Sequence, residues 1–434
     1  MAQSDHLLVL VHGLWGNVSH FDYITRAIDE FFTVESASEP NPDPHVLVCR
    51  SNEGYKTYDG IDVCGEKVAN EIEAALHSYE QAGIPIRRLS VVGYSLGGLM
   101  ARYAIGLLYQ RGWFKKLTPV NFTTFCSPHL GVRAPGRDLA TTMFNTFVPR
   151  TISATGRQLF LNDQFATTGM PLLSFLADKG SIFFHALTLF PHRALYANVV
   201  NDIRTAWFTS AIQPTDPFLD LVNYETNCLP GYETTILDAA NPVVRRRAAD
   251  DDVAVVDHAA PPAAAVKAAR QLLLLQKALL SFVTTLLVSP VWVLAFLISA
   301  AIQTFYSSRR LREFHSNHKG RYGMDEFRLL RLDEQVEDVV ETVLGDLVPY
   351  GLHSLDLDAE EPKTDGPTPA VLDLAPQQLT ICRNLNTLEW ERFPVHITKT
   401  KAAHAAVIVR HMDWKGMEEG EVVIRHWLNE VLVV

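Results

Sequence analysis

Cysteine is scarce in this sequence and irregularly placed. The five cysteines, Cys49, Cys64, Cys126, Cys228 and Cys382, are widely spaced and form no C-x-x-C pair. An odd number without paired spacing argues against a disulfide framework or a zinc site and favours a reducing compartment. The sequence also lacks the basic stretch and long apolar run that mark a secretory signal before the first strand-like segment. We therefore expect a protein that is not secreted.

Positive charge is in short supply as well. Lysine and arginine number 38 against 49 aspartate and glutamate residues, which gives a formal net charge of −11. Nucleic acid is therefore not an expected partner, because phosphate backbones are bound by clustered lysine and arginine. Hydrophobic residues, in contrast, make up 47% of the 434 residues, enough for a large domain that carries insertions.

Predicted strands and helices alternate along the first 125 residues. Short apolar runs predict buried strands, and apolar residues every three or four positions predict helices. Such alternation favours an α/β architecture with a mostly parallel, doubly wound sheet. The predicted strands are 6–11, 46–50, 89–92, 121–125, 194–200 and 393–397, and the first predicted helices are 23–32, 59–81 and 99–108.

The alternation is lost between residues 133 and 191. Apolar clusters at helical spacing, with several glycines and prolines, predict either a helical lid over a site or an ordinary helical excursion. We expect a core over residues 1–212, an insertion over 213–380, and a C-terminal completion of the core over 381–434.

A G-x-S-x-G motif runs from Gly93 to Gly97, between a predicted strand and a predicted helix. On this tight turn the hydroxyl of Ser95 would project above the edge of the sheet. The flanking glycines suit a strained turn in which a Cβ would clash with neighbouring backbone. The motif in this context predicts an α/β-hydrolase fold with Ser95 as the nucleophile.

The segment Leu10-Val11-His12-Gly13-Leu14 ends the first predicted strand. Acyl transfer needs hydrogen-bond donors for an oxyanion, and in this fold they are the amide after the nucleophile and one from an early loop. We assign these donors to Leu96 and Leu14. His12 is expected to brace the loop rather than to act as a base.

The acid and the base should follow the nucleophile in the chain order Ser, Asp or Glu, His. Asp202 comes directly after the strand 194–200, and we take it as the acid. The other carboxylates in irregular sequence are Asp216, Asp220 and Asp238. His404 follows the last predicted strand among small residues and is the expected base, whereas His396 lies within that strand, and His411 and His426 are expected at the surface.

The sequence resembles the fungal putative serine esterases of the α/β-hydrolase class, a family that includes a lipid-droplet phospholipase of yeast. The resemblance covers most of residues 6–212 and 380–434. It implies cleavage of fatty acyl esters from phospholipids or other glycerolipids at a lipid surface, with Ser95, Asp202 and His404 as the triad. The matching stretches are LVLVHGLWGN, GIDVCGEKVANEI, VVGYSLGGLMARYAIG, FTTFCSPHLGVR, YANVVNDIRTAWFTSAI and HAAVIVR.

These residues predict ester cleavage through an acyl-enzyme, without a metal or an organic cofactor. Transfer of the acyl group to a lipid alcohol and cleavage of a thioester would use the same triad, so both stay open. A catalytically idle hydrolase fold that serves as a lipid-surface scaffold is the alternative from another class.

Residues 278–308 contain no aspartate, glutamate, lysine or arginine. Their length would permit one membrane span, but the candidate triad residues lie on both sides of the segment and must meet on one side of a bilayer. Pro290, near the middle, would break a helix. We therefore expect a re-entrant hairpin over about 272–308 that anchors the protein to lipid droplets or to the cytosolic face of the endoplasmic reticulum. A buried helix is the alternative.

Overall fold

The computed structural model describes residues 4–35, 43–165, 168–219, 221, 224–245, 294, 297–314 and 370–434. Most of the uncharged segment 278–308 lies outside these residues, so the hairpin expected there stays a prediction. The charged segment near 332–347, whose pattern predicts a helix, and the proline- and aspartate-rich segment 356–369, which predicts a linker, also lie outside them.

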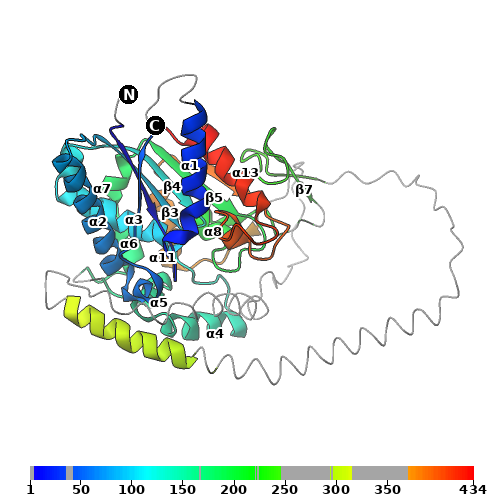
Figure 1. The fold of residues 1–434 in the computed structure, drawn as a ribbon. Helices are drawn as coiled ribbons and strands as arrows, with labels where there is room; N and C mark the ends of the chain where they lie inside the picture. Colours follow the sequence, from blue (N-terminus) through cyan, green and yellow to red (C-terminus); the bar gives the residue numbers. More distant parts are fainter. Residues whose placement is uncertain are drawn as a thin grey trace, which may run out of the picture.

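Six parallel strands form one sheet in the order β10-β5-β4-β3-β1-β2 (Figure 1). Chain order reverses between β1 and β3, which is the point at which such sheets place their sites. There Val11 lies opposite Gly93, so the segments that follow the two strands leave the sheet side by side. The predicted α/β-hydrolase fold is confirmed. The strands are β1 (His6–Val11), β2 (His45–Val48), β3 (Arg88–Tyr94), β4 (Thr118–Phe125), β5 (His192–Asn198) and β10 (Glu391–Val395).

Helices cover both faces of the sheet (Figure 1). On one face, α2 (Ile61–Gln81) and α3 (Leu96–Gln110) pack on a continuous layer of buried aliphatic side chains. On the other face, α1 (Asp22–Glu35) and α13 (Glu418–His426) pack around the fully buried Trp427. The inner strands β1, β3, β4 and β5 are mostly buried on both sides, which explains their apolar sequences, whereas the edge strands β2 and β10 are only partly buried.

Residues 133–191 form four short helices, in line with the predicted helical character. The helix α7 packs on α3, where the Phe183 ring stacks on Tyr103 with centroids 4.7 Å apart. The first helix, α4, instead leaves Leu139, Met143 and Phe147 exposed. The helices are α4 (Leu139–Phe147), α5 (Ser153–Leu159), α6 (Leu172–Leu176) and α7 (Ile182–Thr188).

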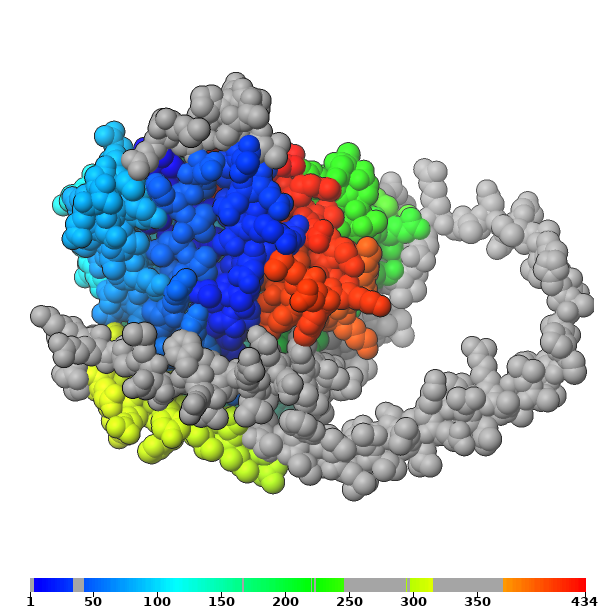
Figure 2. Space-filling model, viewed as in Figure 1, coloured from blue at the N-terminus to red at the C-terminus, as the bar shows by residue number. Residues whose placement is uncertain are grey.

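A further helix over residues 297–314 lies on the surface at the lower edge of the molecule (Figure 2). Among the described residues, no helix is both long and apolar enough to cross a bilayer. The other elements are short: η1 (Val18–Phe21), η2 (Gly54–Asp59), η3 (Trp113–Lys115), η4 (Val148–Arg150), α8 (Trp207–Ser210), β6 (Thr215–Asp216), β7 (Tyr224–Thr226), β8 (Val243–Arg245), β9 (Ala370–Val371), α11 (Pro376–Leu385), α12 (Ala403–Ala406) and η6 (Trp427–Val431).

Several histidines are buried in the fold. Burial lowers the pKa of His6, His12 and His426 from 6.5 to about 4 in each case, because the charged imidazolium would lose its hydration. The folded protein therefore resists protonation of these side chains, whereas the unfolded chain accepts the protons near pH 6.5.

Stability should consequently be fully present above pH 6.5 and fall as the pH decreases towards 4. Each such histidine contributes a slope of about 1.4 kcal/mol per pH unit in that window. Urea unfolding at pH 7.5, 6.0 and 5.0 measures the slope, and His426→Gln should reduce it by removing one titrating group. A free energy of unfolding that is constant between pH 7.5 and 5.0 would contradict this account.

Candidate active site

Three side chains from distant parts of the sequence meet at the carboxyl edge of the sheet. Ser95 follows β3, Asp202 follows β5, and His404 follows β10 on the short helix α12. His404 Nε2 lies 2.9 Å from Ser95 Oγ, and His404 Nδ1 lies 2.9 Å from Asp202 Oδ2. The structure thus brings the three predicted residues into one hydrogen-bonded chain.

The backbone at Ser95 is strained, with φ 54° and ψ −128°. Such a conformation persists only where the surroundings enforce it, and it is typical of functional sites. Close packing enforces it here, since a Cβ on Gly97 would lie 2.0 Å from the Val11 carbonyl oxygen and one on Gly93 would lie 2.3 Å from Gly98 Cα. Gly97 is therefore required because the start of α3 packs against the end of β1, and Gly93 is required because the end of β3 packs against Gly98.

The loop after β1 touches the serine. A Cβ on Gly13 would lie 2.7 Å from Ser95 Cβ, so only glycine fits at this contact. The Trp15 amide donates to Thr57 Oγ1 at 3.1 Å, whereas the Leu14 amide has no backbone acceptor in the part of the chain that the structure describes. Leu96 is the first residue of α3, and first-turn amides have no partner within their own helix. Both predicted oxyanion donors are therefore available.

His12 lies buried in the same loop. Its Nδ1 lies 3.1 Å from the Gly13 carbonyl oxygen, a contact within the loop itself. The ring is 1% exposed and its lowered pKa keeps it neutral near pH 7. This placement agrees with the expected bracing role.

Four donors surround the Asp202 carboxylate. Oδ1 accepts from the amides of Arg204 and Thr205 at 3.0 and 2.8 Å, and Oδ2 accepts from Asn198 Nδ2 at 3.0 Å in addition to His404. Burial alone would raise the pKa of Asp202, but the charge of His404 and these hydrogen bonds outweigh burial and hold the pKa below its ordinary value. The carboxylate therefore stays ionised and can stabilise a charged imidazole.

Tyr94 contacts both the backbone and the ring of His404. Its hydroxyl donates to the His404 carbonyl oxygen at 2.8 Å, and the two rings lie 5.1 Å apart. From the sequence Tyr94 was only a neighbour of the nucleophile, because a contact across 310 positions leaves no local pattern. The sequence gives one indication: as the last residue of a strand before Ser95, Tyr94 should point to the face of the sheet opposite to that of its neighbours in the strand.

The rival acids and bases lie elsewhere. The carboxylates of Asp216 and Asp238 accept from the amides of Phe218 and Ala240 at 2.9 Å, as turn residues do, and Asp220 lies outside the described residues. His396 sits on the chain just past β10, where its amide donates to the Thr235 carbonyl oxygen.

The expectation that His426 lies at the surface is wrong. The side chain is 2% exposed, and its Nδ1 lies 2.7 Å from the Tyr196 hydroxyl. Its helix, α13, packs across one face of the sheet, so this position turns inward.

Cys126 Sγ, a carboxylate oxygen of Asp202 and a ring nitrogen of His404 lie within 4.8 Å of one another. These donor types could bind a zinc-like ion. Both nitrogens of His404 are already engaged, with Ser95 and Asp202, and burial raises the pKa of Cys126 well above its ordinary value, which disfavours the thiolate. The group fits a hydrogen-bonded triad better than a metal centre.

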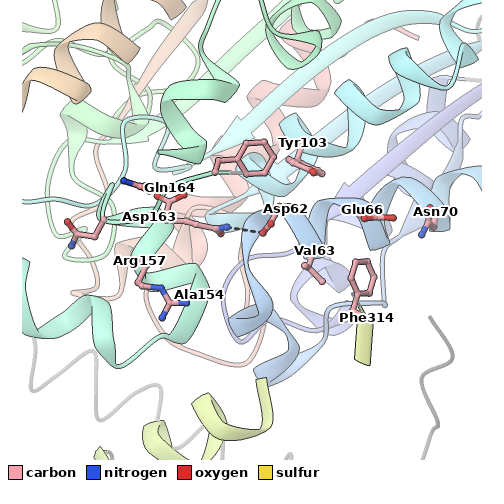
Figure 3. Close-up of a pocket in the computed structure, with 13 residues that line it drawn as sticks. Asp62, Val63, Glu66, Asn70, Tyr103, Ala154, Arg157, Asp163, Gln164 and Phe314 are labelled. Carbon is pink, nitrogen blue, oxygen red and sulfur yellow. Dashed lines mark hydrogen bonds between the residues drawn. The ribbon is translucent and has the colours of Figure 1, made fainter. Parts of the chain in front are cut away.

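A cavity of about 920 Å³ lies apart from this triad (Figure 3). It is bounded by α2, α3, α5 and the end of the helix 297–314, and none of the three triad residues lines it. Gln158 donates to Asp62 across its wall at 2.8 Å. Its polar lining, with Asp62, Glu66 and Asp163, differs from the apolar cleft expected for an acyl chain.

Residues 1–213 match the model of a protein family described as "Putative serine esterase (DUF676)". The match covers slightly less than half of the chain. The matched region includes Ser95, Asp202 and the Leu14 loop, whereas His404 lies beyond it.

Curated relatives match about half of the chain. The chain is 32% identical to Putative lipase ROG1 of Saccharomyces cerevisiae over 214 residues, which cover 48% of this chain and 28% of the relative. It is 28% identical to Putative lipase C4A8.10 of Schizosaccharomyces pombe over 220 residues, 49% of this chain and 26% of the relative. The match thus spans less than a third of the length of these relatives.

Solved structures show a weaker similarity. A lipase-esterase related protein from Clostridium acetobutylicum is 15% identical, with 48% of this chain and 79% of that chain covered and a TM-score of 0.26. A similarity at that level carries no argument about activity.

Ser95→Ala, His404→Ala and Asp202→Asn should each abolish hydrolysis of p-nitrophenyl butyrate while the protein stays folded. Loss of the serine or histidine of such a triad costs a factor of at least ~10⁴ in kcat. Asp238→Asn is the matched control, because its carboxylate only caps a local turn, and it should retain full activity. A fully active Asp202→Asn, or an inactive Asp238→Asn, would refute the assignment of the acid.

Proposed function

We propose that the protein is a serine hydrolase that cleaves fatty acyl esters of glycerolipids, phospholipids foremost, through an acyl-enzyme on Ser95. The observation that carries the proposal is the unbroken hydrogen-bonded chain Ser95–His404–Asp202, next to which we place the oxyanion donors Leu14 and Leu96. The match of residues 1–213 to the serine esterase model and the similarity to proteins described as lipases support it.

The reaction follows from the geometry. His404 Nε2 takes the proton of Ser95 as Oγ bonds to the acyl carbonyl carbon, and the amides of Leu14 and Leu96 stabilise the oxyanion. His404 then gives that proton to the departing alcohol as the ester C–O bond breaks. A water molecule, deprotonated by His404, attacks the acyl-serine, and the fatty acid leaves as Ser95 regains its proton.

The exposed side chains of two surface helices support the proposal that the substrate is insoluble in water. In the helix 297–314 the large apolar side chains of Ile298, Ile302 and Phe305 are exposed at one-turn spacing, while Ala300 and Ser307 are buried. In α4 the pattern is the same, with apolar residues exposed and the polar Thr141 and Asn145 buried. This inversion is unfavourable in water and suits a lipid surface.

These helices lie at the carboxyl edge of the sheet, where the triad also lies. The helix 297–314 contacts η2, which follows the carboxyl end of β2, and α4 lies at the same lower edge of the view (Figure 1). Docking by this edge would place Ser95 near the lipid. We therefore propose that the protein acts at lipid droplets or at the cytosolic face of the endoplasmic reticulum.

Wild-type protein incubated with vesicles of mixed phospholipids, acylglycerols and sterol esters should release free fatty acid and lysophospholipid, detected by mass spectrometry. Ser95→Ala should release neither. Fatty acid from acylglycerols or sterol esters without lysophospholipid would overturn the phospholipid preference, and no lipid product at all would overturn the proposed function.

The same assay tests the docking edge. Met143→Glu and Phe305→Glu should lower the release from vesicles about tenfold or more and leave p-nitrophenyl butyrate hydrolysis unchanged, because a buried charge at a lipid surface is costly. Val244→Glu, on the exposed strand β8, is the matched control. Equal losses in all three variants would contradict docking by this edge.

A further inference from the structure

A carboxylate and two cations are buried together beside the active-site loop. Asp59 Oδ2 lies 3.0 Å from Lys67 Nζ, and Asp59 Oδ1 lies 2.9 Å from Arg310 Nη2. The Asp59 side chain is fully buried, and those of Lys67 and Arg310 are 7% and 12% exposed. The carboxylate of Asp59 is thus shared by Lys67 of α2 and Arg310 of the helix 297–314, so the cluster joins both helices to η2.

The cluster fastens the helix 297–314 to η2. Asp59 is the last residue of η2, and Arg310 reaches it from 251 positions later in the chain. The Ser307 hydroxyl donates to Asp59 Oδ1 at 2.9 Å, and Arg310 Nη2 donates to the Tyr55 carbonyl oxygen at 3.1 Å. The inward face of this helix therefore binds η2 through polar groups, opposite its exposed apolar face.

η2 in turn holds the loop that carries the Leu14 amide. Thr57 Oγ1 accepts from the Trp15 amide at 3.1 Å, and the Gly54 amide donates to the Gly16 carbonyl oxygen at 2.9 Å. Trp15 has φ 54°, a left-handed conformation that is costly for a tryptophan. An external hold is needed to keep Trp15 in this conformation, and η2 supplies it.

We propose that Arg310 is a positioning residue for the hydrolysis, acting through Asp59 and η2 to keep the Leu14 amide aimed at the oxyanion. This inference rests on the proposed function. The helix that presents apolar side chains to lipid is thereby joined, in two steps, to the loop that stabilises the transition state. Arg310 touches neither substrate nor triad.

We expect substitution of Arg310 to lower kcat rather than to change KM, because an oxyanion donor stabilises the transition state and not the bound ester. With p-nitrophenyl butyrate, Arg310→Ala should lower kcat roughly tenfold, a part of the 10²–10³ that a whole oxyanion donor is worth, with KM within about twofold of wild type. Arg310→Lys should have a kcat between those of Arg310→Ala and the wild type.

Arg309→Ala is the matched control. Arg309 is the neighbouring residue of the same helix, is largely exposed and pairs with Glu313 within the helix. It should leave kcat unchanged. If Arg309→Ala lowers kcat as much as Arg310→Ala, or if Arg310→Ala raises KM alone, the inference is wrong.

A second variant covers the case in which Arg310→Ala does not fold. Thr57→Val removes the acceptor of the Trp15 amide and leaves the buried charges in place, so it should also lower kcat. Combined with Arg310→Lys, its effect should be less than multiplicative, because both act on one loop. Normal kcat in Thr57→Val would overturn the inference, whereas full activity of Ser95→Ala would overturn the proposed function itself.

Discussion

The parallel pairing of β10 with β5 is the constraint on which the candidate site depends. Glu391–Val395 lies in register with residues 194–198, so the segments after both strands leave the sheet at the same edge. Only this pairing lets His404 reach Asp202, although 202 positions separate them. The candidate nucleophile, acid and oxyanion loop lie within residues 1–213, which match the serine esterase model, and the candidate base comes from the late part of the chain.

The carboxyl edge of the sheet also unites chemistry with surface properties. Ser95 and Trp15 both have positive φ angles there. Close packing of the neighbouring glycines stabilises this conformation at Ser95, and hydrogen bonds with η2 stabilise it at Trp15. Next to them lie two helices that bury polar side chains and expose large apolar ones. Polar groups on the inner side of the helix 297–314 bind the buried carboxylate of Asp59. The exposed apolar surface that we propose binds lipid is thus connected by a few buried hydrogen bonds to the strained loop that we propose stabilises the oxyanion.

Local patterns in the sequence predict much of this arrangement. Each of the six sheet strands overlaps a predicted apolar run, although β10 begins at Glu391, two residues before the strand predicted at 393–397. The position of Ser95 follows from glycines that the turn requires. Chain order beyond a strand end led to Asp202 and His404, which the structure brings together. The support of Tyr94 for His404 and the link from Arg310 to Asp59 have no such pattern, since each joins residues hundreds of positions apart. The burial of His426 has no local pattern either, because it depends on how α13 packs against the sheet.

In the proposed mechanism Ser95 carries the acyl group during turnover. Rapid acid quenching of the enzyme with a phospholipid substrate, followed by proteolysis and mass spectrometry, tests this claim most directly. The account predicts a fatty acyl ester on the peptide that contains Ser95 and none on the same peptide from Ser95→Ala. It also predicts accumulation of this ester in His404→Ala after acylation by an activated ester, because that variant lacks the base for deacylation. An active wild-type enzyme whose acyl group is found on another residue, or on none, would contradict the account.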